Sequence, residues 1–248
     1  MWLALTFAVG IGLALGLMGG GGAIITVPVL VYAAQVPPGQ AVGMSLAVVG
    51  VTSLVGALLK ARQGFIHVRA ALWFGGTGIL GALAGAQLTP LVPPRVLLFL
   101  FALLMVAVAV AMLLRKEELL EPFPECRPWR CGLAGLAVGV LTGFLGVGGG
   151  FLLVPAMVIF ARLPLKVAVG TSLSVIAVNS FAGLAGHWRH TEFNWPLTAG
   201  FTAAALVGMG AGLLLTAHVP VRPLSRAFAW FVLAVAGFVL FKNGVVPN

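Results

Sequence analysis

The sequence predicts an all-α polytopic integral membrane protein made of two homologous repeats. Hydrophobic residues make up 61% of the 248 residues and charged residues only 8%, and the mean hydropathy is +1.14. A soluble domain is usually about 25% charged, so this chain lacks the charged surface that would keep it in water. Apolar runs of membrane-spanning length and an internal duplication complete the case. The composition excludes a soluble enzyme, a disordered regulator and a disulfide-stapled secreted domain.

The charged residues are mostly cations in short gaps between apolar runs. Fourteen Lys and Arg face five acids, all of them Glu. Cations placed in this way set the orientation of a membrane protein in lipid, and they do not form the dense basic patch that nucleic acid requires. The lipid bilayer is therefore an expected partner, and nucleic acid is not.

Six apolar runs have the roughly 17–25 residues that a helix needs to cross a bilayer. They cover residues 41–59, 70–92, 95–114, 168–186, 196–217 and 225–241. Each is predicted to form one spanning helix.

Two further apolar regions, residues 2–34 and 132–161, are cut by glycines at 19–22 and 146–150. The arms after the cuts, residues 23–34 and 151–161, are too short to span, because about 12 helical residues reach only about 18 Å. Glycine runs break a helix and expose its backbone, which must then be buried in protein or line a polar cavity. This pattern is typical of the discontinuous helices at transporter binding sites.

The sequence contains an internal repeat: its second half aligns with its first half without a gap when Gly139 is placed opposite Gly12. Between residues 12–56 and 139–183, 19 of 45 positions are identical. Glycines, prolines and serines recur in this one register, as at Gly12/Gly139, Gly19/Gly146, Pro28/Pro155, Ser45/Ser172, Ser53/Ser180 and Gly56/Gly183. We therefore expect a first membrane repeat over residues 1–114, a polar linker over 115–131 and a second membrane repeat over 132–248.

Each repeat is predicted to hold a Gly-broken or re-entrant helix pair plus three spanning helices. An even number of crossings per repeat would make the repeats parallel, whereas an odd number would invert the second. With residues 60–69 inside, the parallel arrangement places nine Lys and Arg inside and five outside, and the inverted one places eleven and three. The positive-inside rule favours the inverted arrangement, with both termini outside.

The two glycine segments carry a recognisable motif. Residues 16–28 read GLMGGGGAIITVP and residues 143–155 read GFLGVGGGFLLVP, and each is followed by AVGxSL at 41–46 and 168–173. The pair resembles the duplicated signature of the sulfite exporter TauE/SafE family, and the resemblance covers essentially the whole chain. It implies a permease for small sulfur-containing anions, such as sulfite or organosulfonates, in the cell inner (cytoplasmic) membrane.

The glycine breaks also have a physical interpretation as an anion site. A helix N-terminus offers unpaired N–H groups and the positive end of its dipole to an oxyanion, and the next helix of each repeat adds hydroxyls and an amide. The alternative is structural: glycines that pack helices and hydroxyls that bond their own backbone. The candidate substrate-binding residues are Gly19, Gly21, Gly22, Ser45, Thr52, Ser53, Gly146, Gly148, Gly149, Ser172, Asn179 and Ser180.

Other chemistry has little support in the sequence. There is no Asp, no Glu lies within a predicted span, and Cys126 and Cys131 are expected to be two reduced thiols in the linker. We therefore expect no enzyme activity, no cofactor and no metal. The residues predict a secondary transporter that moves a small anion by alternating access, and the resemblance implies that the anion is a sulfur-containing oxyanion (sulfite, thiosulfate or organosulfonate). An anion channel is the alternative, followed by a membrane-embedded enzyme or a scaffold of sulfur metabolism.

Overall fold

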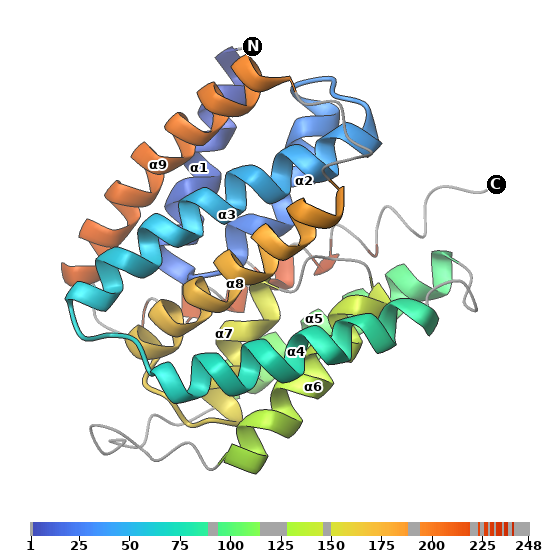
Figure 1. Ribbon diagram of the computed structural model, residues 1–248, viewed down its shortest axis with the longest axis vertical. Coiled ribbons are helices and arrows are strands. Elements are labelled where there is room, and N and C mark those ends of the chain that lie inside the picture. The colour runs from blue at the N-terminus through green and yellow to red at the C-terminus, as the bar shows by residue number, and fades with distance from the viewer. Residues whose placement is uncertain are drawn as a thin grey trace.

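The computed structural model in Figure 1 describes residues 2–88, 94–114, 128–145, 150–187 and 194–218, together with part of 223–240. The described residues form helices joined by short turns, and none of them lies in a strand. The predicted all-α fold class is therefore confirmed. The helices are α1 (Trp2–Met18), α2 (Gly21–Tyr32), α3 (Pro38–Arg62), α4 (Val68–Leu88), α5 (Pro94–Leu114), α6 (Pro128–Leu145), α7 (Gly150–Ile159), α8 (Leu165–His187) and α9 (Trp195–His218).

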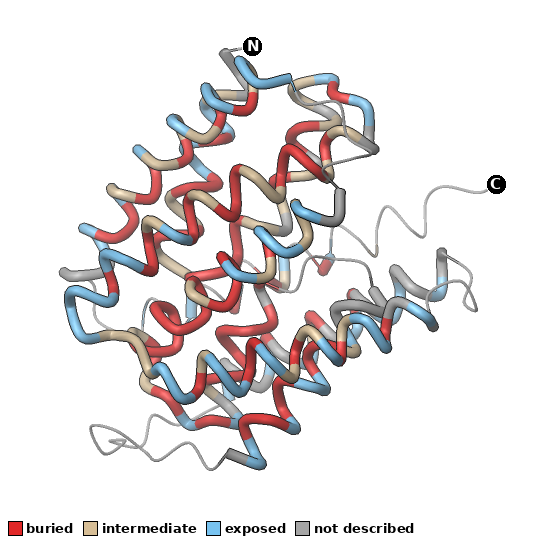
Figure 2. Tube along the Cα trace, in the orientation of Figure 1, coloured by how far each residue is buried: buried red, intermediate tan, exposed pale blue. Residues whose placement is uncertain are grey.

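Five of the six predicted spans fall on single helices in the described part of the chain. Among the described residues, α3, α4, α8 and α9 are long and apolar enough to cross a membrane. The run at 95–114 forms α5, and the run at 225–241 lies partly outside the described residues. Large apolar side chains point outward from these helices, with Leu72 71%, Val207 69% and Leu214 70% exposed. Figure 2 shows such exposed positions along the outer faces of the helices, as expected of surfaces that contact lipid.

The first glycine segment ends α1 and turns the chain back on itself. Gly19 has φ +70, a left-handed conformation that favours glycine. A β-carbon at Gly22 would meet the Ile11 carbonyl and the Leu15 side chain, so α2 returns along α1. The short arms begin slightly earlier than predicted, at Gly21 in α2 and at Gly150 in α7, because glycines can occupy the first helical turn.

The short helices α2 and α7 end in the same kind of turn. Val36 N–H donates to the Leu30 carbonyl at 3.0 Å, and Leu163 N–H donates to the Met157 carbonyl at 3.1 Å. Gln35 and Arg162 have φ values of +56 and +53. Each helix end is thus closed by a backbone bond between residues six apart, next to a left-handed residue of the kind that commonly ends helices. Every position coincides with its counterpart in the register of the internal repeat.

Helices from different halves of the chain form the closest pairs. Figure 1 shows α1 beside α9 and α4 beside α6. Gly12 lies against Ala205 and Gly16 against Gly212, so residue numbers rise together and α1 runs parallel to α9. Small residues let these backbones approach closely, as is common between membrane helices.

The α4–α6 pair repeats the contacts of the α1–α9 pair. A β-carbon at Gly208 would meet the Val9 carbonyl and the Leu13 amide, and one at Gly81 would meet the Leu136 carbonyl and the Val140 amide. In the register of the internal repeat, Gly208 corresponds to Gly81, Val9 to Leu136 and Leu13 to Val140. The two halves of the chain therefore exchange helices in a matching way.

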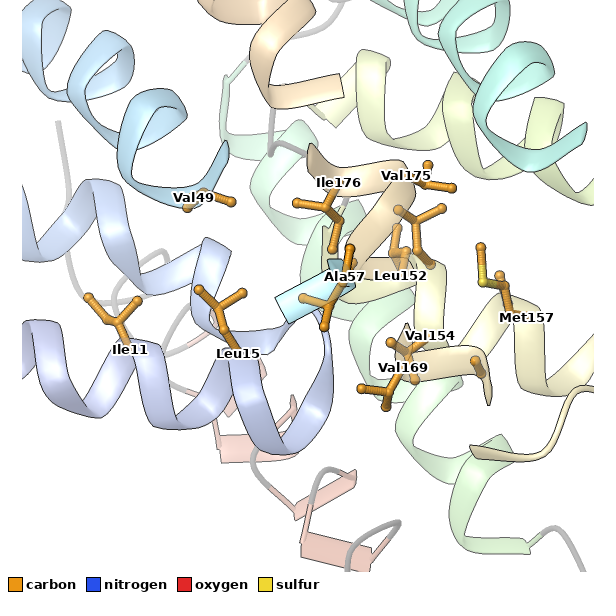
Figure 3. Packing of buried hydrophobic residues seen from close by; sticks show 14 of the residues in the cluster. Ile11, Leu15, Val49, Ala57, Leu152, Val154, Met157, Val169, Val175 and Ile176 are labelled. Atoms are coloured by element: carbon orange, nitrogen blue, oxygen red, sulfur yellow. The ribbon is translucent and has the colours of Figure 1, made fainter. Parts of the chain in front are cut away.

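The corresponding helices α3 and α8 cross at the centre of the molecule and run antiparallel. A β-carbon at Gly183 would lie 3.3 Å from Leu46 Cδ1, and one at Gly56 would lie 3.1 Å from Leu173 Cδ1, so residue numbers fall along one helix as they rise along the other. Figure 3 shows the apolar core around this crossing, with side chains from α1, α3, α7 and α8.

Candidate functional site

The first glycine break lies against α8 of the other half of the chain. Ser172 Oγ lies 2.9 Å from the Val169 carbonyl and 3.3 Å from the Gly19 carbonyl, and it can donate to either. A β-carbon at Gly19 would lie 2.8 Å from Ser172 Oγ and 2.9 Å from Val169 Cα. Two residues predicted separately for the site, Gly19 and Ser172, are thus brought into direct contact.

The start of α7 lies beside the same break. A β-carbon at Gly150 would lie 3.3 Å from the Gly20 carbonyl oxygen, 3.3 Å from Ala23 Cβ and 3.2 Å from Ile176 Cδ1. Ile176 lies one helical turn after Ser172 on α8. The N-terminal ends of α2 and α7 therefore meet on one face of α8.

The N-terminus of α2 has no side-chain cap. Gly20 is its N-cap residue and makes no side-chain hydrogen bond. The first bond of this helical turn runs from Ala23 N–H to the Gly20 carbonyl at 3.3 Å. The amides of Gly21 and Gly22 come before that bond, and amides in the first turn of a helix are available to an external acceptor. Gly19, Gly21 and Gly22 are all buried, so any such acceptor would be bound inside the protein.

Several of the predicted hydroxyl residues bond their own helix. Ser45 Oγ donates to the Val42 carbonyl at 2.8 Å, and Thr52 Oγ1 donates to the Val48 carbonyl at 2.7 Å. Hydroxyls that bond the backbone of their own helix have a structural role there, which is the alternative to anion binding. Ser45, Thr52, Ser53, Ser172 and Ser180 are all buried.

Two predicted site residues hold a buried polar atom without a hydrogen-bond partner. Within the described part of the chain these atoms are Ser53 Oγ on α3 and Asn179 Oδ1 on α8. Asn179 follows Ser172 by two helical turns on the same face of α8. Buried polar atoms in proteins are nearly always paired. The Ser53 hydroxyl can donate to an anion, whereas Asn179 Oδ1 is an acceptor and pairs only with a donor.

Three of the predicted residues, Gly146, Gly148 and Gly149, lie outside the described residues. The sequence did not predict Val169 and Ile176, which lie against Gly19 and Gly150. It also did not predict that Lys60 is a buried cation. Lys60 follows Ser53 by two helical turns, a spacing that could have drawn attention to it. In the described ranges, no three His, Cys, Asp or Glu side chains are grouped so that they could hold a metal ion.

The expectation of two reduced thiols is wrong. Cys131 is fully buried and disulfide-bonded, and Cys126, the other cysteine of the sequence, lies outside the described residues. Two cysteines in a sequence are too few to indicate a disulfide framework. Their count alone could not show that the start of α6 buries one sulfur in a bonded position.

Comparison with known proteins identifies the family of the chain. Residues 3–239 match the family described as sulfite exporter TauE/SafE. A "Probable membrane transporter protein" of Xylella fastidiosa (strain Temecula1 / ATCC 700964) is 34% identical over 244 residues, which are 94% of this chain and 92% of the relative. The "Probable membrane transporter protein YdhB" of Bacillus subtilis (strain 168) is 29% identical over 235 residues, 93% of this chain and 96% of the relative. No solved structure matches significantly. The chain therefore belongs to the sulfite exporter TauE/SafE family and is a membrane transporter.

Proposed function

We propose that the protein is a secondary transporter of the cytoplasmic membrane that moves a small sulfur-containing oxyanion by alternating access. The observation that carries the proposal is the meeting of the α2 and α7 N-termini on α8, with Gly150 against Gly20 and Gly19 against Ser172. Helix N-termini bind oxyanions through free amides and the helix dipole. The unpaired Ser53 hydroxyl, buried on the neighbouring helix, supplies a further donor.

The antiparallel crossing of α3 and α8 supports alternating access. Two corresponding helices that span the membrane in opposite directions belong to inverted repeats. In transporters with such repeats, one half rocks against the other around a site near the bilayer midplane. The contacts between Gly19 and Ser172 and between Gly150 and Gly20 join the two halves of the chain, as a site between two such halves requires.

The test is flux into liposomes that contain the purified protein alone. We expect saturable uptake of sulfite, thiosulfate or an organosulfonate, together with counterflow, and with sulfate and acetate as comparison anions. Flux that never saturates and shows no counterflow would indicate a channel instead. Substrate that emerges chemically altered would indicate an enzyme, and liposomes without any flux would favour a scaffold.

A matched pair of hydroxyl variants locates the site. Ser53→Ala removes the unpaired donor, and loss of a hydrogen bond to a charged ligand should raise KM about tenfold or more. Its thermal stability should be equal or higher, because no protein hydrogen bond is lost. The control is Ser174→Ala on α8, whose Oγ donates to the Gly170 carbonyl at 3.2 Å. A wild-type KM in Ser53→Ala would remove this hydroxyl from the site.

A further inference from the structure

Lys60 is the one charged side chain that is buried among the described residues. It lies in the last turn of α3 and is only 3% exposed, whereas Ala61 and Arg62 beside it are exposed. An amphipathic Lys at a helix end usually extends its ammonium into water. The structure holds this one inside.

The turn after α3 folds over Lys60 and keeps it covered. Phe65 N–H donates to the Lys60 carbonyl at 3.0 Å, and His67 N–H donates to Thr171 Oγ1 on α8 at 3.0 Å. His67 Nδ1 in turn accepts from the Ala70 N–H at 3.0 Å and so caps α4. Because bonds at both ends fix this turn, the burial of Lys60 is part of the packed structure.

The ammonium of Lys60 has no acidic partner in the described part of the chain, because none of the five Glu falls there. Its Nζ lies 5.5 Å from the centre of the Phe65 ring, a contact that offsets part of the cost of burial. Lys166 lies one helical turn before Gly170 on α8, and a β-carbon at Gly170 would lie 3.1 Å from Lys60 Cβ, so a second cation belongs to the same end of the α3–α8 pair. A buried ammonium beside a second cation is unfavourable, and either loss of its proton or a bound anion relieves the cost.

Lys60 also lies on the same face of α3 as Ser53, the unpaired hydroxyl of the proposed site. Ser53, Gly56 and Lys60 are three and four residues apart and share one face of α3. That face meets α8, since a β-carbon at Gly56 would lie 3.1 Å from Leu173 Cδ1 and one at Gly170 would lie 3.1 Å from Lys60 Cβ. The two helical turns from Ser53 to Lys60 correspond to about 10 Å along the helix.

We propose that Lys60, assisted by Lys166, forms a second anion-binding site at this end of the α3–α8 pair, where the transported oxyanion is held on its way to or from the glycine breaks. The inference rests on the proposed function and assigns a residue to it. The anion serves as a counter-ion of the buried ammonium, whose three N–H donors suit a compact oxyanion. The Ser53 hydroxyl is the next donor along the same helix face.

The test compares Lys60→Met, Lys60→Arg and the control Arg62→Gln in liposomes, with thiosulfate as the probe. Lys60→Met should raise KM about tenfold or more through loss of a charged hydrogen bond. Lys60→Arg should keep most of the wild-type affinity, because it preserves the charge. Arg62→Gln, on the exposed side of the same helix end, should stay within about twofold of the wild type.

Thermal unfolding gives a second measurement that does not require flux. Replacing a buried charge by an apolar side chain of similar size is often neutral or stabilising, so Lys60→Met should unfold no earlier than the wild type in the absence of anion. The wild type should gain stability with added thiosulfate at constant ionic strength, and Lys60→Met should lose at least half of that gain.

The results separate this inference from the proposed function. If the wild type transports thiosulfate and Lys60→Met does so with unchanged KM and an unchanged thermal gain, the Lys60 site is wrong while the transporter stands. If no tested sulfur oxyanion moves but thiosulfate still stabilises the wild type through Lys60, the proposed substrate movement fails while the anion site stands. Loss of stability in Lys60→Met without anion would make Lys60 a structural cation and overturn the inference.

Discussion

At the scale of single residues, residues of the same type or of similar chemistry in the sequence have different surroundings in the structure. Thr52 and Ser53 are neighbouring buried hydroxyl residues, yet Thr52 bonds its own helix while Ser53 Oγ has no partner. Gly19 and Gly64 both have positive φ, +70 and +74, yet Gly19 is packed against α8 whereas Gly64 has no atom within 4 Å of its missing β-carbon. Such differences make Ser53 and Gly19, and not Thr52 and Gly64, the stronger candidates for the proposed site.

We predict that Gly19→Ala abolishes transport whereas Gly64→Ala does not. Both variants force a left-handed backbone on alanine, at about 1–2 kcal/mol. Only Gly19→Ala also places a β-carbon 2.9 Å from Val169 Cα, a backbone atom that cannot turn away. Flux in liposomes and thermal unfolding of both variants check this. Equal behaviour of the two variants would show that only backbone strain matters at Gly19.

At the scale of helices, close parallel pairs join the two halves of the chain. Gly12 lies against the Ala205 carbonyl in the α1–α9 pair, and Gly139 lies against the Gly78 carbonyl in the α4–α6 pair. Lipid provides little hydrophobic drive for helix association, so van der Waals packing between closely approaching backbones must hold these pairs together. Each pair is therefore sensitive to any added side chain at its contact glycines.

We expect Gly12→Ala to destabilise the protein by about 1–3 kcal/mol, the usual cost of overpacking. Gly10→Ala is the control on the same helix, because nothing lies within 4 Å of a β-carbon there. The control should be neutral or slightly stabilising, since alanine is the better helix former. Thermal unfolding in detergent measures both. A Gly12→Ala protein as stable as the control would mean that α1 and α9 can separate without cost.

At the scale of the whole molecule, the antiparallel α3–α8 crossing bears on membrane topology. Gln35 and Arg162 occupy equivalent turns before α3 and α8, and both are exposed. If α3 and α8 span the membrane as packed, these two turns lie on opposite sides. The end of α3 then lies on the same side as Arg162, since Lys60 meets Gly170 near the start of α8.

Cysteine labelling tests this arrangement. In a background with Cys126 and Cys131 replaced by serine, we predict that Gln35→Cys and Arg162→Cys react with an impermeant maleimide from opposite sides of the membrane. Gln63→Cys, in the exposed turn after α3, should react from the same side as Arg162→Cys. From the positive-inside count we expect that side to be the cytoplasm. Labelling of Gln35→Cys and Arg162→Cys from one side would establish parallel repeats.

Much of this architecture could be predicted because it depends on features of the sequence itself, namely apolar runs, glycine clusters and an internal repeat. Charge-free runs predicted α3, α4, α8 and α9, and the first glycine run predicted that α1 ends there and is followed by a short helix. The register of the internal repeat predicted which positions correspond, such as Ser45 and Ser172. These features need no knowledge of neighbours, since hydrophobic length and glycine clusters act on the chain itself.

The sequence by itself thus determined the membrane class, the helix breaks, the duplication and the candidate residues. Only the tertiary structure decided that α1 pairs with α9, that Gly19 meets Ser172, that Ser53 Oγ lacks a partner and that Lys60 is buried. The physical reason is that the spanning helices are apolar on all sides. Periodicity therefore cannot tell which face of such a helix meets protein and which meets lipid, and only the packing of the backbones makes that choice.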